Sequence, residues 1–124
     1  MLRSLAFGGA LLAFGAAFAA SPSPATRAEI DHLFVYLEKS GCEFFRNGDW
    51  HGAADARLHL ERKYNAMVGS GQVATADDFI ARGASQSSAS GKPYLVRCGG
   101  GPAVPSARWL GDELQRFRQT VGKK

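Results

Sequence analysis

The sequence predicts an α+β fold: a small three-stranded antiparallel sheet, about four helices packed on one face of it, and one disulfide. Two observations carry this prediction. An Asn47-Gly48 pair separates two short strand-like segments, while patterns typical of amphipathic helices come before and after them. The chain of 124 residues also contains two cysteines, Cys42 and Cys98, which are available to each other as partners.

The first twenty residues have the organisation of a secretory signal peptide. Arg3 supplies a charged start, Ser4–Phe18 is apolar apart from its first residue, and Ala17 and Ala19 form a small-residue cleavage site. The apolar run is shorter than the ~20 residues of a membrane-spanning helix. We therefore expect residues 1–20 to be removed, leaving a periplasmic or secreted protein with no membrane span.

Residues 21–25 contain two prolines and are expected to be a linker. The following residues, 26–120, are enough for one globular α+β domain, and residues 121–124 form a basic tail. The net charge of the whole chain is only +4. This mild excess, together with the predicted export, argues against a nucleic-acid partner.

Four helices are expected. The first begins with a Thr26-x-x-Glu29 capping box and ends before Gly41, and a second covers 53–67. A short third helix opens at Thr75, and a final helix is capped by Ser106.

The strands come from two places in the chain. Asn47-Gly48 favours a type I′ turn between strands at 42–46 and 49–51. A further strand at 94–98 is expected to pair with this hairpin in antiparallel fashion, and 99–105 is expected to be a loop. That pairing would bring Cys42 near Cys98 in an oxidising compartment, where a disulfide is stable.

Several short motifs occur in an order that is familiar from one family. They are Asn47-Gly48, His59-Leu60-x-x-Lys63, Thr75-Ala-x-Asp-Phe79, Ser87-Ser-x-Ser-Gly-Lys-Pro-Tyr94 with Cys98, and Pro105-Ser-Ala-x-Trp-Leu110. Over about residues 27–118 the chain resembles the small exported bacterial proteins of the YfeK type, a domain of unknown function. The resemblance implies one exported domain with a Cys42–Cys98 bridge, and it brings no activity with it.

The serine-rich segment before the last strand is the first candidate binding site. Its candidate residues are Ser87, Ser88, Ser90, Gly91, Lys92 and Tyr94. Hydroxyls, backbone N–H groups and a lysine in one loop can bind an anion. The alternative is that the serines only satisfy the backbone of a turn, with Gly91 and Pro93 shaping the entry to the strand. A Walker A loop is excluded because the upstream glycine is missing and a strand follows.

Two residues of the second helix are weaker candidates. Arg57 either extends past the edge of the core or forms a paired guanidinium that faces a ligand or a carboxylate. His59 is either a half-buried structural histidine or a general base. The three histidines have no metal-ligand spacing and both cysteines are expected to be oxidised, so we expect no metal and no cofactor.

These features favour a non-enzymatic binding or envelope-support protein, whose partner is an envelope protein or an anionic or glycan ligand. One alternative is a periplasmic lysozyme inhibitor, because Ser90-Gly91-Lys92-Pro93-Tyr94 is similar to the inhibitory loop of such proteins. A second alternative is a small hydrolase that uses His59 and a serine. No residue of the sequence is assigned a catalytic role.

Overall fold

The computed structural model describes residues 21–122, so the predicted signal peptide and the last two lysines of the predicted basic tail lie outside the described residues. The described chain folds as α1 (Pro24–Lys39), β1 (Glu43–Arg46), β2 (Asp49–His51), α2 (Ala53–Gly69), α3 (Ala76–Arg82), β3 (Leu95–Arg97), β4 (Val104–Pro105) and α4 (Ser106–Gly122). The α+β class and the four helices are confirmed.

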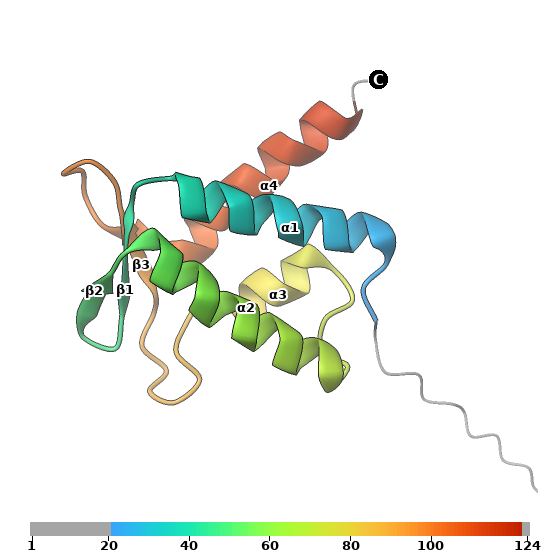
Figure 1. The fold of residues 1–124 in the computed structure, drawn as a ribbon, viewed down its shortest axis with the longest axis horizontal. Helices are drawn as coiled ribbons and strands as arrows, with labels where there is room; N and C mark the ends of the chain where they lie inside the picture. The colour runs from blue at the N-terminus through green and yellow to red at the C-terminus, as the bar shows by residue number, and fades with distance from the viewer. Residues whose placement is uncertain (1–20, 123–124) are drawn as a thin grey trace, which may run out of the picture.

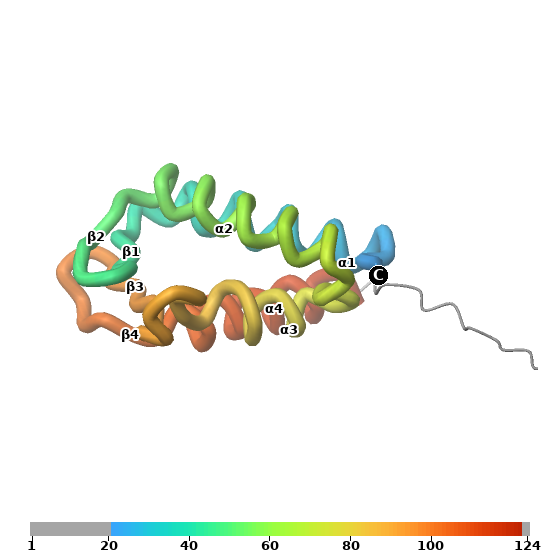
Figure 2. Tube along the Cα trace, turned by 90° about the horizontal axis from the view of Figure 1, so that it is seen from below, coloured from blue at the N-terminus to red at the C-terminus, as the bar shows by residue number. Residues whose placement is uncertain are grey.

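The helices form two layers with the sheet at one end. Figure 2 shows α1 and α2 side by side in one layer and α3 and α4 in the other, and Figure 1 places the sheet beyond the end of these helices. The sheet has the order β2-β1-β3-β4, and each neighbouring pair is antiparallel. The prediction of three strands was wrong, because residues 104–105 of the expected loop pair with β3 as a fourth strand.

The register of the sheet decides which side chains face the helices. Phe44 of β1 lies opposite Val96 of β3, and both are buried in the core. Because side chains alternate along a strand, Arg46 projects to the same side as Phe44. The core itself is a single cluster to which α1 contributes Ile30, Leu33, Phe34 and Leu37.

The predicted hairpin turn is confirmed. Asn47 has φ +50° and Gly48 has φ +90°, as a type I′ turn requires, and β1 and β2 pair on either side of it. The predicted disulfide is also present: Cys42 and Cys98 flank the paired strands β1 and β3, with their Cα atoms 4.3 Å apart. The hairpin is therefore tied covalently to β3.

The start of the first helix differs from the prediction. Helix α1 begins at Pro24, inside the expected linker, and Ser23 caps it by accepting a hydrogen bond from the Thr26 backbone N–H at 3.1 Å. Proline favours the first turn of a helix because it lacks an N–H that would go unpaired there. Thr26 is instead a buried residue whose hydroxyl donates to the Ala74 carbonyl, so the Thr26/Glu29 capping box was wrong.

Candidate functional site

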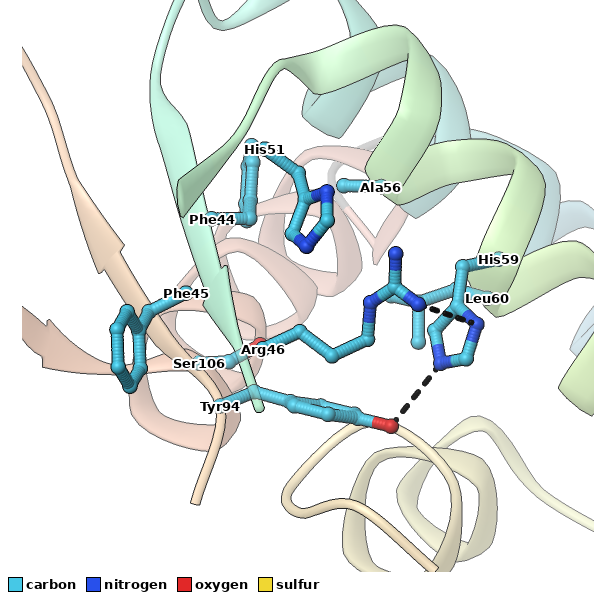
Figure 3. Close-up of a pocket in the computed structure, with 9 residues that line it drawn as sticks. All are labelled: Phe44, Phe45, Arg46, His51, Ala56, His59, Leu60, Tyr94 and Ser106. Carbon is cyan, nitrogen blue, oxygen red and sulfur yellow. Dashed lines mark hydrogen bonds between the residues drawn. The ribbon is translucent and has the colours of Figure 1, made fainter. Parts of the chain in front are cut away.

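A small pocket opens where the hairpin, α2 and the residue before β3 meet. Figure 3 shows the side chains around it. They are Phe44, Phe45, Arg46 and His51 from the hairpin, Ala56, His59 and Leu60 from α2, Tyr94, and Ser106 at the start of α4. Elements from four parts of the chain thus place two histidines, an arginine and a tyrosine around one space.

His59 is the centre of a hydrogen-bonded network. Its Nδ1 lies 3.3 Å from Nη1 of Arg46, and its Nε2 lies 3.1 Å from the Tyr94 hydroxyl oxygen. Lys63, one helical turn further along α2, donates to the same Tyr94 oxygen at 3.1 Å and to the Gln86 carbonyl at 3.1 Å. The four side chains form a continuous chain from the hairpin to the 85–94 loop.

The donor and acceptor roles in this network follow from chemistry. A guanidinium can only donate, so the Nδ1 of His59 must accept from Arg46 and carries no proton. The proton of the neutral ring is then on Nε2, which donates to Tyr94. The Tyr94 oxygen also accepts from Lys63, which fills both of its lone pairs. The hydroxyl proton of Tyr94 has no acceptor among these side chains.

Electrostatics keep His59 neutral. Burial lowers the pKa of His59 to about 4, with further lowering by the positive charges of Arg46 and Lys63, then Arg62 and His51. Burial also lowers the pKa of Lys63 and raises the pKa of Tyr94. Each of these three shifts disfavours the charged form of its group, and burial is the main cause in all three.

Two cations of the site have no acidic partner in the part of the chain that the structure describes. Neither Arg46 nor Lys63 forms an ion pair there, although both are half-buried. His51 has Asp55 at 3.8 Å, but that carboxylate is largely exposed to solvent. One of these cations, Arg46, lines the pocket, and the other, Lys63, lies beside the pocket residue Tyr94, so positive charge gathers at this site.

The serine-rich loop lies beside this network and mostly serves its own turn. Ser87 is buried and its hydroxyl accepts from the backbone N–H groups of Ala89 and Ser90. Gly91 has φ +75°, which a turn at this point requires. These contacts support the turn interpretation for this part of the loop.

The remaining predicted residues of the loop divide in two. Ser90 donates to the Asn47 side chain at 2.9 Å, which links the loop to the hairpin turn, while Ser88 and Lys92 are exposed. Tyr94 alone reaches the pocket, where it meets His59. Two of the predicted site residues are thus brought together, from segments 35 positions apart.

Arg57 lies elsewhere. It pairs with Glu38 of α1 at 2.5 Å and with Glu61 one turn further along α2 at 3.2 Å. The hydrogen bond that Arg57 donates to Glu38 is the main reason that the pKa of Arg57 is raised. The structure thus favours the carboxylate partner over the ligand among the alternatives for Arg57.

Sequence reasoning did not select Arg46 or Lys63, although both had a readable signal. Arg46 stands two residues after the buried Phe44, so it shares that face of the hairpin. Lys63 stands four residues after His59, so it shares that face of α2. The sequence pattern did not indicate that Tyr94 lies between these faces of the hairpin and α2.

Residues 21–122 contain no cluster of three or more His, Cys, Asp and Glu side chains arranged to hold a metal ion. Within the same range, every helix is too short or too polar to cross a bilayer.

Comparison with known proteins places the chain in a family. A curated relative, the uncharacterized protein YfeK of Salmonella typhimurium, is 40% identical over 62 residues, which is 50% of each chain. The chain thus spans about half the length of this relative, and no solved structure matches it. The model of a family of unknown function, DUF5329, matches residues 24–118, which include every element from α1 to most of α4. The chain therefore belongs to the DUF5329 family, as its resemblance to YfeK indicated.

Proposed function

We propose that this protein is a small exported binding protein, without enzymatic activity, that captures an anionic group at the mouth of the pocket. Export is supported by the signal-like residues 1–20, and the binding role by the side chains around His59. The ligand is held by Arg46, Lys63 and the Tyr94 hydroxyl, with His59 holding the three in place.

One observation carries the proposal: the network around His59 has only donors left to offer. Both ring nitrogens of His59 are occupied, and so are both lone pairs of the Tyr94 oxygen. What remains are N–H groups of Arg46 and Lys63 and the O–H of Tyr94. A surface of donors beside two positive charges matches a ligand rich in acceptors, which is to say an anion.

The positive charges of the site also favour an anionic ligand. Burial lowers the pKa of Lys63, and it is the main cause of the lowered pKa of the half-buried His59, to which the positive charges of Arg46 and Lys63 contribute. An anion beside Arg46 and Lys63 would offset these positive charges. Groups with strongly perturbed ionisation beside a pocket are frequent at binding sites.

The two alternative functions find less support. In a lysozyme inhibitor the tyrosine of the Ser90–Tyr94 loop would have to project from the surface, yet Tyr94 is 6% exposed and its hydroxyl is bonded inside the molecule. In a hydrolase His59 would have to face a serine. Its two nitrogens instead bond Arg46 and Tyr94, and no serine among the described residues bonds to it.

The proposal is tested by titrating the purified, disulfide-bonded protein with inorganic phosphate and with acetate at low ionic strength. Binding is followed in ¹H–¹⁵N correlation spectra, which report the residues that respond. We expect shifts concentrated at residues 44–51, 56–63 and 94. Arg46→Gln and Lys63→Gln should each weaken binding about tenfold or more, because a charge-assisted hydrogen bond is lost.

Lys92→Gln is the matched control, since it removes one positive charge from an exposed residue of the serine-rich loop. It should leave the affinity within about twofold. Equal losses in all three variants would mean that the anion responds only to net charge, and the proposed site would be wrong. Absence of any binding at millimolar anion would have the same meaning.

A further inference from the structure

The pocket has a second, apolar end. Besides Arg46, the pocket is lined by the apolar side chains of Phe44, Ala56 and Leu60, which are 7%, 7% and 5% exposed. Figure 3 shows Ala56 and Leu60 on α2 facing the strand that carries Phe44 and Arg46. A guanidinium therefore borders a space lined by carbon, and an inorganic anion would leave that space unused.

The space is small. Its cavity volume is about 20 Å³, which is about the room that one water molecule needs. A methyl group is of similar size, whereas a branched aliphatic or aromatic side chain is several times larger. The enclosed part of this open pocket thus has room for about one methyl-sized group beside Arg46.

Ser106 supplies a polar group to the same space. The residue is 2% exposed, and its hydroxyl forms no hydrogen bond to any other described residue. Since no fully buried side-chain N or O in residues 21–122 lacks a partner, the remaining exposure of Ser106 must include its oxygen, at the pocket that it lines. Its hydroxyl is available to donate to a ligand, at the positive end of the 17-residue helix α4.

We infer that the anion is a carboxylate whose neighbouring carbon bears a methyl-sized group. Such a group occurs at the end of a peptide that terminates in alanine, and it also occurs in a free short carboxylic acid. This inference rests on the proposed anion site. Arg46 and the Ser106 hydroxyl donate to the carboxylate oxygens, and the methyl group fills the space between Ala56 and Leu60. A preceding peptide carbonyl, where there is one, accepts from the Tyr94 hydroxyl or from Lys63.

The test compares small ligands on the purified, disulfide-bonded protein in the same spectra. The ligands are N-acetyl-alanine, its amide, N-acetyl-glycine, N-acetyl-phenylalanine, N-acetyl-alanyl-alanine, propionate and inorganic phosphate. We expect N-acetyl-alanine to bind at least tenfold more tightly than its amide, which lacks the charge, and than N-acetyl-phenylalanine, which exceeds the cavity. N-acetyl-alanyl-alanine separates the two sources: tighter binding than propionate indicates a peptide end, and equal binding indicates a free acid.

Two variants locate the ligand. Ser106→Ala should weaken N-acetyl-alanine about fivefold or more, and Ala56→Val should abolish the preference for N-acetyl-alanine over N-acetyl-glycine by filling the cavity. Ala54→Val is the matched control, because Ala54 is exposed on the same helix. If Ala56→Val does not fold, Ser106→Ala alone decides.

The outcomes separate this inference from the anion site on which it rests. Phosphate binding at Arg46 and Lys63 with no difference between acid and amide would overturn the carboxylate and leave the anion site standing. Equal affinity for N-acetyl-alanine and N-acetyl-phenylalanine would overturn the role of the cavity. No response to any anion would overturn both.

Discussion

Charges are arranged in opposite ways at the two ends of the molecule. At the helical end, Arg118 of α4 donates to Glu29 of α1 at 2.8 Å and to Asp77 of α3 at 2.9 Å, and so ties three helices together. At the sheet end, Arg46 and Lys63 surround a neutral histidine without a carboxylate among the described residues. The sheet end also has a paired cation, since Arg97 donates to Glu43 at 2.8 Å, but Arg46 and Lys63 bond only neutral groups there.

This difference separates structural charges from functional ones. A paired guanidinium is satisfied in the folded protein, and the pKa of Arg118 is raised mainly by its hydrogen bond to Glu29. Unpaired, half-buried cations disfavour folding, and local departures of this kind are expected at binding sites. The predictions below follow the contrast from the largest expected effect to the smallest.

The sheet end depends on its cross-link more than the helical end does. Replacing both Cys42 and Cys98 by alanine removes a bridge that spans 56 positions, and should lower the free energy of unfolding by about 4 kcal/mol. Denaturant unfolding of the two forms measures the loss. A loss below about 1 kcal/mol would show that strand pairing alone holds the pocket together.

At the helical end, Arg118→Ala should destabilise the protein by about 1 to 2 kcal/mol, because it leaves the half-buried Glu29 without its partner. Lys39→Ala, at an exposed residue in the last turn of α1, controls for loss of a positive charge and should cost only a few tenths of a kcal/mol. Thermal or denaturant unfolding compares them. Equal effects would mean that the three-helix ion pair contributes nothing specific.

Acid should weaken the sheet end through His59. The pKa of this ring is about 4 in the folded protein and 6.5 in a free histidine. Between these values the unfolded chain binds a proton that the folded one does not, so stability falls as the pH is lowered from about 6.5 to 4. Allowing for partial solvent exposure, we expect His59 to account for about 1 to 2 kcal/mol.

The measurement is the free energy of unfolding at pH 7 and at pH 4.5, for the native protein and for His59→Gln. The variant should lose less stability on acidification than the native protein does. Identical losses would mean that His59 titrates normally and that the positive charges around it have little influence.

The smallest expected change in stability is that of a variant at the sheet end. Arg46→Gln removes a charge that opposes ionisation of its neighbours, so it should leave stability unchanged or raise it by a few tenths of a kcal/mol. Arg118→Ala is expected to lower the free energy of unfolding, whereas Arg46→Gln is expected to leave it unchanged or to raise it. A loss of 1 kcal/mol or more would show that Arg46 is structural, and the difference between the two ends would disappear.

Local signals in the sequence were sufficient for much of the fold. Asn47-Gly48 predicts the hairpin because few other pairs accept positive φ at both positions, and the two cysteines had only each other as partners. The fourth strand was missed because its two residues, Val104 and Pro105, are too few to show an alternating pattern. The helix start at Pro24 was missed because Thr26 and Glu29 offered a second plausible cap.

The site was harder to predict than the fold, for a geometric reason. His59 and Tyr94 were both selected, but from separate arguments that did not place them together. Arg46 and Lys63 become meaningful only when the hairpin and α2 face each other across Tyr94, which no local pattern specifies. The serines of the 85–94 loop attracted attention through composition, yet Ser87 and Ser90 serve mainly to hold that loop.

The most direct test of the account is the protonation state of His59. The ¹⁵N shifts of its ring nitrogens, recorded across pH 3.5 to 8, report both the tautomer and the pKa. The account predicts a neutral ring with its proton on Nε2 and a pKa of about 4. A proton on Nδ1 would contradict the account, because Nε2 of His59 would then be an acceptor and the donor-only surface would not exist. A pKa above 6 would contradict the effect of burial and of the neighbouring positive charges on this ring.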